Sequence, residues 1–412
     1  MVLHPKIVSF VRTSLRFAAF LYLIDGLVLP SDRVVKQKDT LEQPRLNLQS
    51  HERYDLLDKK TNVLLLQGWE VDGEKLVNDN SARYSLSLYD PSVAISRVRE
   101  INIFFLQTPD HFIEVMAPLT MGSLNIVASA SVIDVNPARP DSFMKQIKQE
   151  ENLVEVKQDA IGAHITIESP KLNFSFKRRD DPLMRSYLKV QAKEIDLAFE
   201  ALFDGSHESN YWVTPLTDDK FTEFVTWKRA GIPLKPFKYK IAGTEYTCGP
   251  RECLLTTDQY RGHHNYGMQF HFALAQGTTS AGDAFGIILQ EGIGSKYSAL
   301  DRASEDHINV NGEVFKLDQA DFQVERIEAD GKKAFKVAIS TRSGDSMHFP
   351  ENTCKLSFES SLYLKEGINL VLLAHRRDFF YGTYSVDCTV QGGKVIQESA
   401  VKGFFEHVWS RH

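Results

Sequence analysis

Residues 258–273 of this 412-residue chain, DQYRGHHNYGMQFHFA, bring together side chains that could do acid–base chemistry. The reactive groups that precede the aromatic end of this segment are Asp258, Arg261, His263, His264 and Tyr266. Asp258 could act as a base or orient Arg261, and either histidine could carry a proton near neutral pH. The alternative is an Asp258–Arg261 ion pair that only fixes a turn, with the histidines partly exposed.

The aromatic end of the segment alternates as a β-strand does. Phe270 and Phe272 fall on one face and His271 on the other, because successive strand residues point to opposite sides. In a barrel wall, one of these two sets faces the interior. We therefore expect a ligand-binding role for Phe270, His271 and Phe272, with Arg261 as a fixed positive donor.

Two later segments add carboxylates. Glu305 lies in the run SEDH, and Glu406 and Trp409 lie in the C-terminal run GFFEHVWSRH. We expect Glu305 and Glu406 to be catalytic candidates that face a cavity, and Trp409 to contact the ligand. The alternative is that both runs are polar strand ends. The resulting site prediction is that one cavity gathers Asp258, Arg261, Tyr266, His271 and Glu305.

The sequence lacks the signals of several other functions. The formal net charge is −6, without the clustered basic footprint of a nucleic-acid partner. His263, His264 and His271 do not have the spacing of a metalloprotease site, so we expect no bound metal. We find no dinucleotide or phosphate loop and no nucleophile elbow, and therefore expect no cofactor.

The elements that must position these residues are predicted to be strands. Period-two alternation is clear in residues 164–168, 172–176 and 195–201. Asn311-Gly312, Asp330-Gly331 and Gly392-Gly393 each separate two strand-like runs, as in β-hairpins. Residues 141–152 are the one segment here that we expect to be helical. The predicted fold is mostly β with little helix: tandem lipocalin-like antiparallel barrels or a large β-sandwich.

The chain is expected to divide into four parts. Residues 1–30 form a targeting segment or short anchor, and residues 31–58 form a polar linker outside the barrel core. The β region then comprises an N-terminal half (59–205) and a C-terminal barrel half (206–412). The first segment is basic, acid-free before Asp25, and apolar from residue 17. A signal or anchor, a mitochondrial presequence, a peripheral membrane contact and an ordinary peripheral helix all remain open.

The four cysteines do not have zinc-site spacing. Cys248 and Cys253 flank Gly249-Pro250, and the other two are Cys354 and Cys388. Buried or free thiols are one interpretation. A loop disulfide between Cys248 and Cys253 is the other, and it requires an oxidising compartment.

Over residues 60 to 412 the chain resembles domain-of-unknown-function family 2804. The motifs that carry the resemblance are Asp258, Arg261-Gly262, Tyr266 and Phe270 to Ala273; Glu305 to Gly312; Tyr381 to Ser385; and Gly403, Glu406 and Trp409. The family has tryptophans where this chain has Phe270 and Phe272. It is distantly similar to carotenoid hydratases and tocopherol cyclase-like proteins, which have tandem lipocalin-like barrels and act on isoprenoids. The resemblance thus implies a fold, but fold alone does not set function.

Three functions follow as expectations. The first is binding of a hydrophobic small molecule, a lipid or isoprenoid, in a barrel cavity. The second is a lyase or isomerase that protonates an isoprenoid or lipid from Asp258 or Glu305. The third is a non-catalytic protein-interaction scaffold.

Overall fold

The computed structural model describes most of the chain from residue 54 onward. The described ranges are 54–58, 64–78, 98–120, 127–136, 146–152, 156–158, 163–181, 183–216, 223–264, 267–293, 305–329, 332–342, 348–369 and 374–411. Within them the protein is almost entirely antiparallel β-sheet, and the helical elements are two short 3-10 turns, η1 (Gly73–Lys75) and η5 (Gln391–Gly393). No helix in these ranges is long and apolar enough to cross a membrane. The prediction of a mostly β fold is confirmed.

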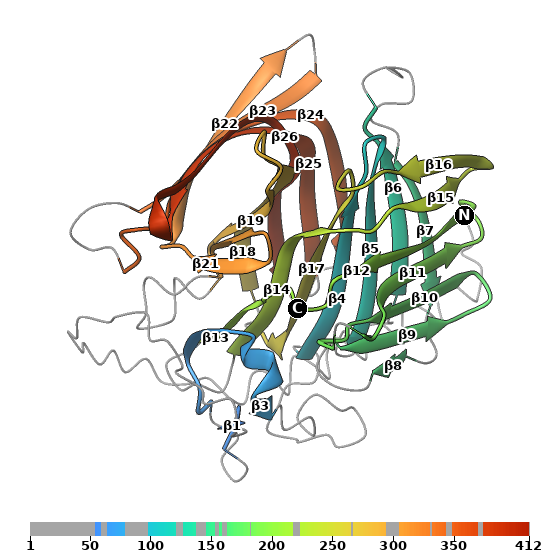
Figure 1. Ribbon diagram of the computed structural model, residues 1–412, viewed down its shortest axis with the longest axis horizontal. Coiled ribbons are helices and arrows are strands. Elements are labelled where there is room, and N and C mark those ends of the chain that lie inside the picture. The colour runs from blue at the N-terminus through green and yellow to red at the C-terminus, as the bar shows by residue number, and fades with distance from the viewer. Residues whose placement is uncertain are drawn as a thin grey trace, which may run out of the picture.

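The central sheet runs through the middle of the molecule (Figure 1). In the described chain its strands follow the order β2 (Gly68–Val71), β13 (Asn210–Pro215), β14 (Glu223–Pro233), β17 (Leu254–His263), β4 (Val98–Gln107), β5 (His111–Thr120), β6 (Val127–Asp134) and β7 (Gln146–Asn152). A parallel pair, β1 (Tyr54–Asp55) and β3 (Val77–Asn78), lies outside this sheet. In β4, β14 and β17 nearly every residue is buried, because other layers cover both faces of the sheet.

The second sheet covers part of one face of the central sheet. Its described order is β16 (Thr244–Cys248), β15 (Phe237–Ile241), β12 (Leu197–Phe203), β11 (Ser186–Ala192), β10 (Leu172–Lys177), β9 (His164–Glu168) and β8 (Val156–Gln158). Residues of β10 and β12 alternate between buried and half-buried, as expected for a sheet with one covered face. Phe174 and Phe176 of β10 pack on Phe104 of β4, which joins the two sheets in one core.

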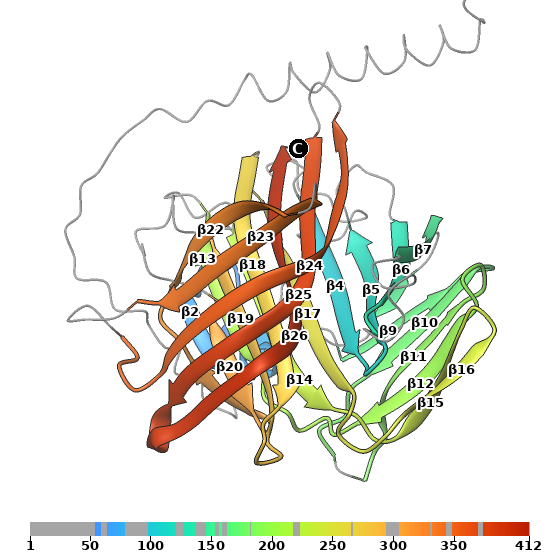
Figure 2. The same ribbon diagram turned by 90° about the horizontal axis from the view of Figure 1, so that it is seen from above.

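The third sheet is C-terminal and curls into a half-barrel (Figures 1 and 2). Its described order is β21 (Glu313–Lys316), β20 (His307–Val310), β19 (Ala284–Glu291), β18 (Gly267–Thr278), β26 (Lys394–Arg411), β25 (Ala374–Val390), β24 (Thr353–Asn369), β23 (Lys332–Thr341) and β22 (Ala320–Ala329). Its outer face packs on the central sheet through an aromatic core that includes Phe105, Phe112 and Phe404. Its inner face encloses a second core around Phe358, Tyr384 and Phe405.

The three expected hairpins are present: β20–β21, β22–β23 and β25–β26. At the first, Asn311 and Gly312 have φ of 51° and 93°, the positive values that this turn requires. The residues of the Asp330-Gly331 turn lie outside the described ranges. The expected helix at residues 141–152 is wrong, because residues 146–152 form strand β7, which pairs with β6.

The chain does not pass into the C-terminal sheet at residue 206, the expected boundary between the two β halves. Strands β13, β14 and β17 follow that residue and belong to the central sheet with β4 to β7, so the passage to the C-terminal sheet falls between His263 and Gly267. The expected linker boundary at residue 58 falls next to buried residues. Leu56 and Leu57 are buried against Tyr211 and Trp227, because two adjacent apolar side chains gain by leaving water. Residues 1–53 lie outside the described ranges.

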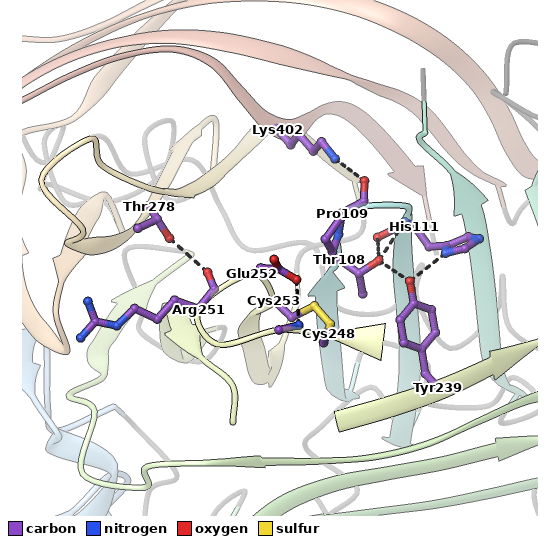
Figure 3. The surroundings of a disulfide bond; sticks show 11 residues. Thr108, Pro109, His111, Tyr239, Cys248, Arg251, Glu252, Cys253, Thr278 and Lys402 are labelled. Atoms are coloured by element: carbon purple, nitrogen blue, oxygen red, sulfur yellow. Dashed lines mark hydrogen bonds between the residues drawn. A yellow bond between two sulfur atoms is a disulfide. The ribbon is translucent and has the colours of Figure 1, made fainter. Parts of the chain in front are cut away.

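The cysteines form two disulfides, Cys248–Cys253 and Cys354–Cys388, so the interpretation as free thiols is wrong. The first closes the β16–β17 loop beside Pro109 of the β4–β5 turn (Figure 3). Around it, the β18 residue Thr278 donates a hydrogen bond to the Arg251 carbonyl and the β26 residue Lys402 donates one to Pro109. These contacts tie the central and C-terminal sheets together at this end.

Candidate functional site

A buried charge cluster lies between the central sheet and the outer face of the C-terminal sheet. Lys228 of β14 stands directly opposite Asp258 of β17. Its Nζ atom lies 2.9 Å from Oδ1 of Asp258 and 2.7 Å from Oε1 of Glu305. The Phe272 ring centre is 4.5 Å from the same nitrogen. Three of the expected site residues, Asp258, Phe272 and Glu305, therefore converge, on a lysine that the sequence analysis did not single out.

The electrostatics of this cluster favour a structural ion pair network. Burial alone would lower the pKa of Lys228, but Asp258 and Glu305 raise it above its ordinary value. Burial raises the pKa of Glu305, and Lys228 opposes that rise. The protonated lysine contacts both carboxylates, while burial and the neighbouring Asp258 leave the pKa of Glu305 above its ordinary value.

Glu406 lies in a second cluster between the same two sheets. Arg377 of β25 places its Nε atom 2.6 Å from Glu406 and its terminal nitrogen 2.8 Å from Glu114 of β5. Burial raises the pKa of Glu406 and Arg377 lowers it. Glu406 thus joins two sheets through an arginine.

The remaining residues of the 258–266 segment do not join Asp258. Arg261 lies three positions further along β17, so it projects from the opposite face, where its guanidinium carbon is 5.4 Å from the Trp227 ring centre. His263 shares that face. His264 packs against Phe224 and Tyr260, with ring centres 5.4 and 6.1 Å away. Tyr266 lies outside the described ranges.

The inner face of the half-barrel carries two adjoining recesses. The outer recess has a volume of about 580 Å³ and the inner recess about 250 Å³. Arg376, Asp378 and His407 line both. Trp409 and Lys365 belong to the outer recess only. The inner recess continues onto an apolar floor that includes Phe335, Phe380 and Phe405.

Strand register builds this site as rows that run across the sheet. One row joins His271 of β18, His407 of β26, Asp378 of β25 and Lys365 of β24. The next row towards the strand ends contains Trp409 directly opposite Arg376. On the other side of the polar row lies an aromatic row, with Phe405 opposite Phe380 and Phe380 opposite Tyr363. From the strand ends, which form the mouth of the recesses, to the floor, the rows therefore change from polar to aromatic side chains.

The polar groups of the recesses are mutually oriented. Asp378 accepts a hydrogen bond from the Tyr363 hydroxyl at 2.6 Å and pairs with Arg376 at 2.6 Å. Nδ1 of His271 lies 3.0 Å from Oε2 of Glu291, and the His271 and His407 ring centres are 4.8 Å apart. Burial and the neighbouring His271 lower the pKa of His407, which favours its neutral form. Within the described ranges, no cluster of three or more metal-ligating side chains occurs.

Of the residues expected to bind a ligand, His271 and Trp409 line these recesses. Phe270 and Phe272 lie on the opposite face of β18 and pack toward the central sheet. Arg376, Asp378 and Tyr363 were not expected from the sequence, and His407 was expected only as a member of the C-terminal run GFFEHVWSRH. Residues 376–381, RRDFFY, show no alternation of polar and apolar side chains, so the local sequence does not mark the residues that face the recess.

Fold and site together define an all-β protein whose C-terminal half-barrel holds a recess with an aromatic floor. The chain belongs to the family described as a domain of unknown function, DUF2804, whose model matches residues 60–412. No curated protein shows significant similarity.

The solved structures that match the chain include CghA with Sch210972, at 10% identity and a TM-score of 0.42, covering 77% of this chain and 89% of that one. Kievitone hydratase from Nectria haematococca matches at 13% identity and a TM-score of 0.42, covering 77% and 91%. At this distance the likeness carries no argument about activity, which must come from the site.

Proposed function

We propose that the protein binds a small molecule with a hydrophobic body in the two recesses of the half-barrel. The observation that carries the proposal is the order of the rows, with polar side chains at the mouth and Phe335, Phe380 and Phe405 behind them. The outer recess of about 580 Å³ lies within the roughly 300–1,000 Å³ of small-molecule sites, which are mostly apolar with a few placed polar groups.

Acid chemistry at Asp258 and Glu305 is the weaker candidate. Lys228 holds both carboxylates between the sheets, and none of the three residues lines either recess. A ligand in the half-barrel would therefore not reach them.

The test is a titration of the full chain with N-phenyl-1-naphthylamine, a neutral apolar fluorophore. Val324 lines the inner recess and is 40% exposed, so Val324→Phe should fill the space that the probe needs. Val395 of β26 is 53% exposed and lines neither recess, so Val395→Phe is the matched control. We expect saturable binding that Val324→Phe weakens about tenfold, equivalent to ~1.4 kcal/mol, and that the control leaves unchanged. Absence of saturable binding, or equal binding by both variants, would contradict the proposal.

A further inference from the structure

We infer that the ligand is an amphipathic acid, whose anionic group lies at the mouth of the half-barrel and whose apolar body lies over the aromatic floor. This inference rests on the proposed function and names its ligand class. It follows from which polar groups of the recesses are already paired within the protein and which still have hydrogen-bonding capacity.

The two carboxylates at the mouth are already engaged. Oδ1 of Asp378 accepts the Tyr363 hydroxyl, and Oδ2 pairs with Arg376, so both oxygens have partners. Glu366 also lines the outer recess, but its carboxylate lies 3.7 Å from the buried Arg377. A cationic or strongly hydrogen-bond-donating ligand would have to compete with these contacts.

The donors at the mouth retain capacity. The Arg376 side chain is 52% exposed, pairs with Asp378 through one terminal nitrogen and interacts with the Tyr363 hydroxyl, and the rest of its five-donor fork is accessible. Lys365 follows Asp378 in the same row and forms no ion pair with any residue in the described ranges. A carboxylate can accept two hydrogen bonds from one guanidinium, so the remaining N–H groups of Arg376 suit an anionic ligand group.

The geometry places the two ends of such a ligand in order. Arg376 and Trp409 face each other across β25 and β26 near the strand ends. Four residues deeper along β25, Phe380 is buried and stacks at 4.9 Å on Tyr363. An acid held at Arg376 therefore directs its chain across Asp378 and His407 onto the aromatic row.

The experiment compares dodecanoic acid, dodecan-1-ol and dodecylamine as competitors of N-phenyl-1-naphthylamine, each below its micellar concentration. The three share one apolar chain and differ in the polar end alone. We expect the acid to displace the probe at a concentration at least tenfold lower than the alcohol, and the amine to be the weakest competitor.

In the variant Arg376→Gln with Lys365→Gln, the acid and the alcohol should displace the probe at similar concentrations, so that the preference for the acid is lost. Arg342→Gln is the control, because Arg342 is a partly exposed arginine paired with Asp321 that lines neither recess. An acid no better than the alcohol, or an acid preference that survives in the double variant, would overturn the inference while the proposed binding function stands. If the probe itself does not bind, the result contradicts the proposed function, and the inference about the ligand class falls with it.

Discussion

Individual charged residues in this protein serve two different purposes. Lys228, Arg377 and their carboxylates are buried between two sheets, where each charge is matched by a partner. Arg376 and Lys365 lie at the mouth of a recess and keep hydrogen-bonding capacity. Buried pairs are costly to break, because the partner left behind has lost its water. The first group therefore contributes to stability, and the second is the one to which the proposed ligand would bind.

Replacing Lys228 by methionine should destabilise the fold strongly. The change leaves Asp258 and Glu305 facing each other without a cation, and breaking a buried pair in this way costs about 3–5 kcal/mol. Urea unfolding measures the loss. The variant that also carries Asp258→Asn and Glu305→Gln should recover most of it. A single variant as stable as the wild type would show that the lysine does not neutralise the pair.

His307 gives a prediction for the pH dependence of stability. Burial lowers its pKa to about 3 in the folded state, against 6.5 when unfolded, and its ring contacts the Glu305 carbonyl at 2.8 Å. Between these values the unfolded chain binds a proton that the folded chain does not. The contribution of His307 is thus complete above pH 6.5 and is lost as pH falls towards 3.

The measurement is the free energy of unfolding of the wild type minus that of His307→Gln, followed from pH 7 to pH 5. We expect the difference to fall by about 2 kcal/mol, at 1.36 kcal/mol per pH unit below 6.5. A difference that does not change with pH would contradict the buried neutral imidazole.

At the scale of elements, strand register decides which residues meet. The period-two alternation within strands and the glycine-containing turns predicted the β fold and all three hairpins, because both signals are local.

The site was harder to predict. Arg261 and Asp258 are close in sequence yet fall on opposite faces of β17, whereas Lys228 reaches Asp258 only through the pairing of β14 with β17. Which face of a strand is concave depends on the curl of the whole sheet, and a period-two pattern does not contain that information. Strand β7 was predicted as a helix because its strand conformation depends on pairing with β6, which the local pattern does not contain.

Two sheets approach each other closely at Gly286 of β19. A Cβ atom there would lie 2.4 Å from the backbone nitrogen of Gly231 in β14, whose φ is +67°. Gly286→Ala should therefore cost about 1–3 kcal/mol by forcing the sheets apart. Gly267→Ala on β18 is the control, because its Cβ would meet nothing within 4 Å. Equal thermal stability of the two variants would show that the backbones do not touch.

The two disulfides should contribute unequally. Cys354 and Cys388 are 34 residues apart, whereas Cys248 and Cys253 are five apart. Because a longer loop loses more entropy in the unfolded chain, removing the first pair should cost roughly 4 kcal/mol and the second about 2 kcal/mol. Unfolding of the two double-alanine variants under oxidising conditions measures both. A larger loss from the Cys248–Cys253 variant would contradict this order.

At the scale of the whole molecule, the protein consists mainly of three packed sheets, and the recesses lie on the C-terminal one. The central sheet is covered on both faces, and the C-terminal sheet packs its outer face on it while its curled inner face carries the two recesses (Figure 2). The central claim is that a ligand occupies this inner face. Trp409 is a natural reporter, because it is 36% exposed and lines the outer recess, whereas the other three tryptophans, Trp69, Trp212 and Trp227, line neither recess.

The most direct test is quenching of tryptophan emission by 2-bromododecanoic acid, whose heavy atom lies beside the carboxylate. The acid should quench saturably in the wild type, because its head group would lie at Arg376, directly opposite Trp409. The Trp409→Phe variant should bind the acid, as competition with N-phenyl-1-naphthylamine would show, and lose the quenching. Saturable quenching that persists undiminished in Trp409→Phe would place the ligand outside the half-barrel and contradict the account.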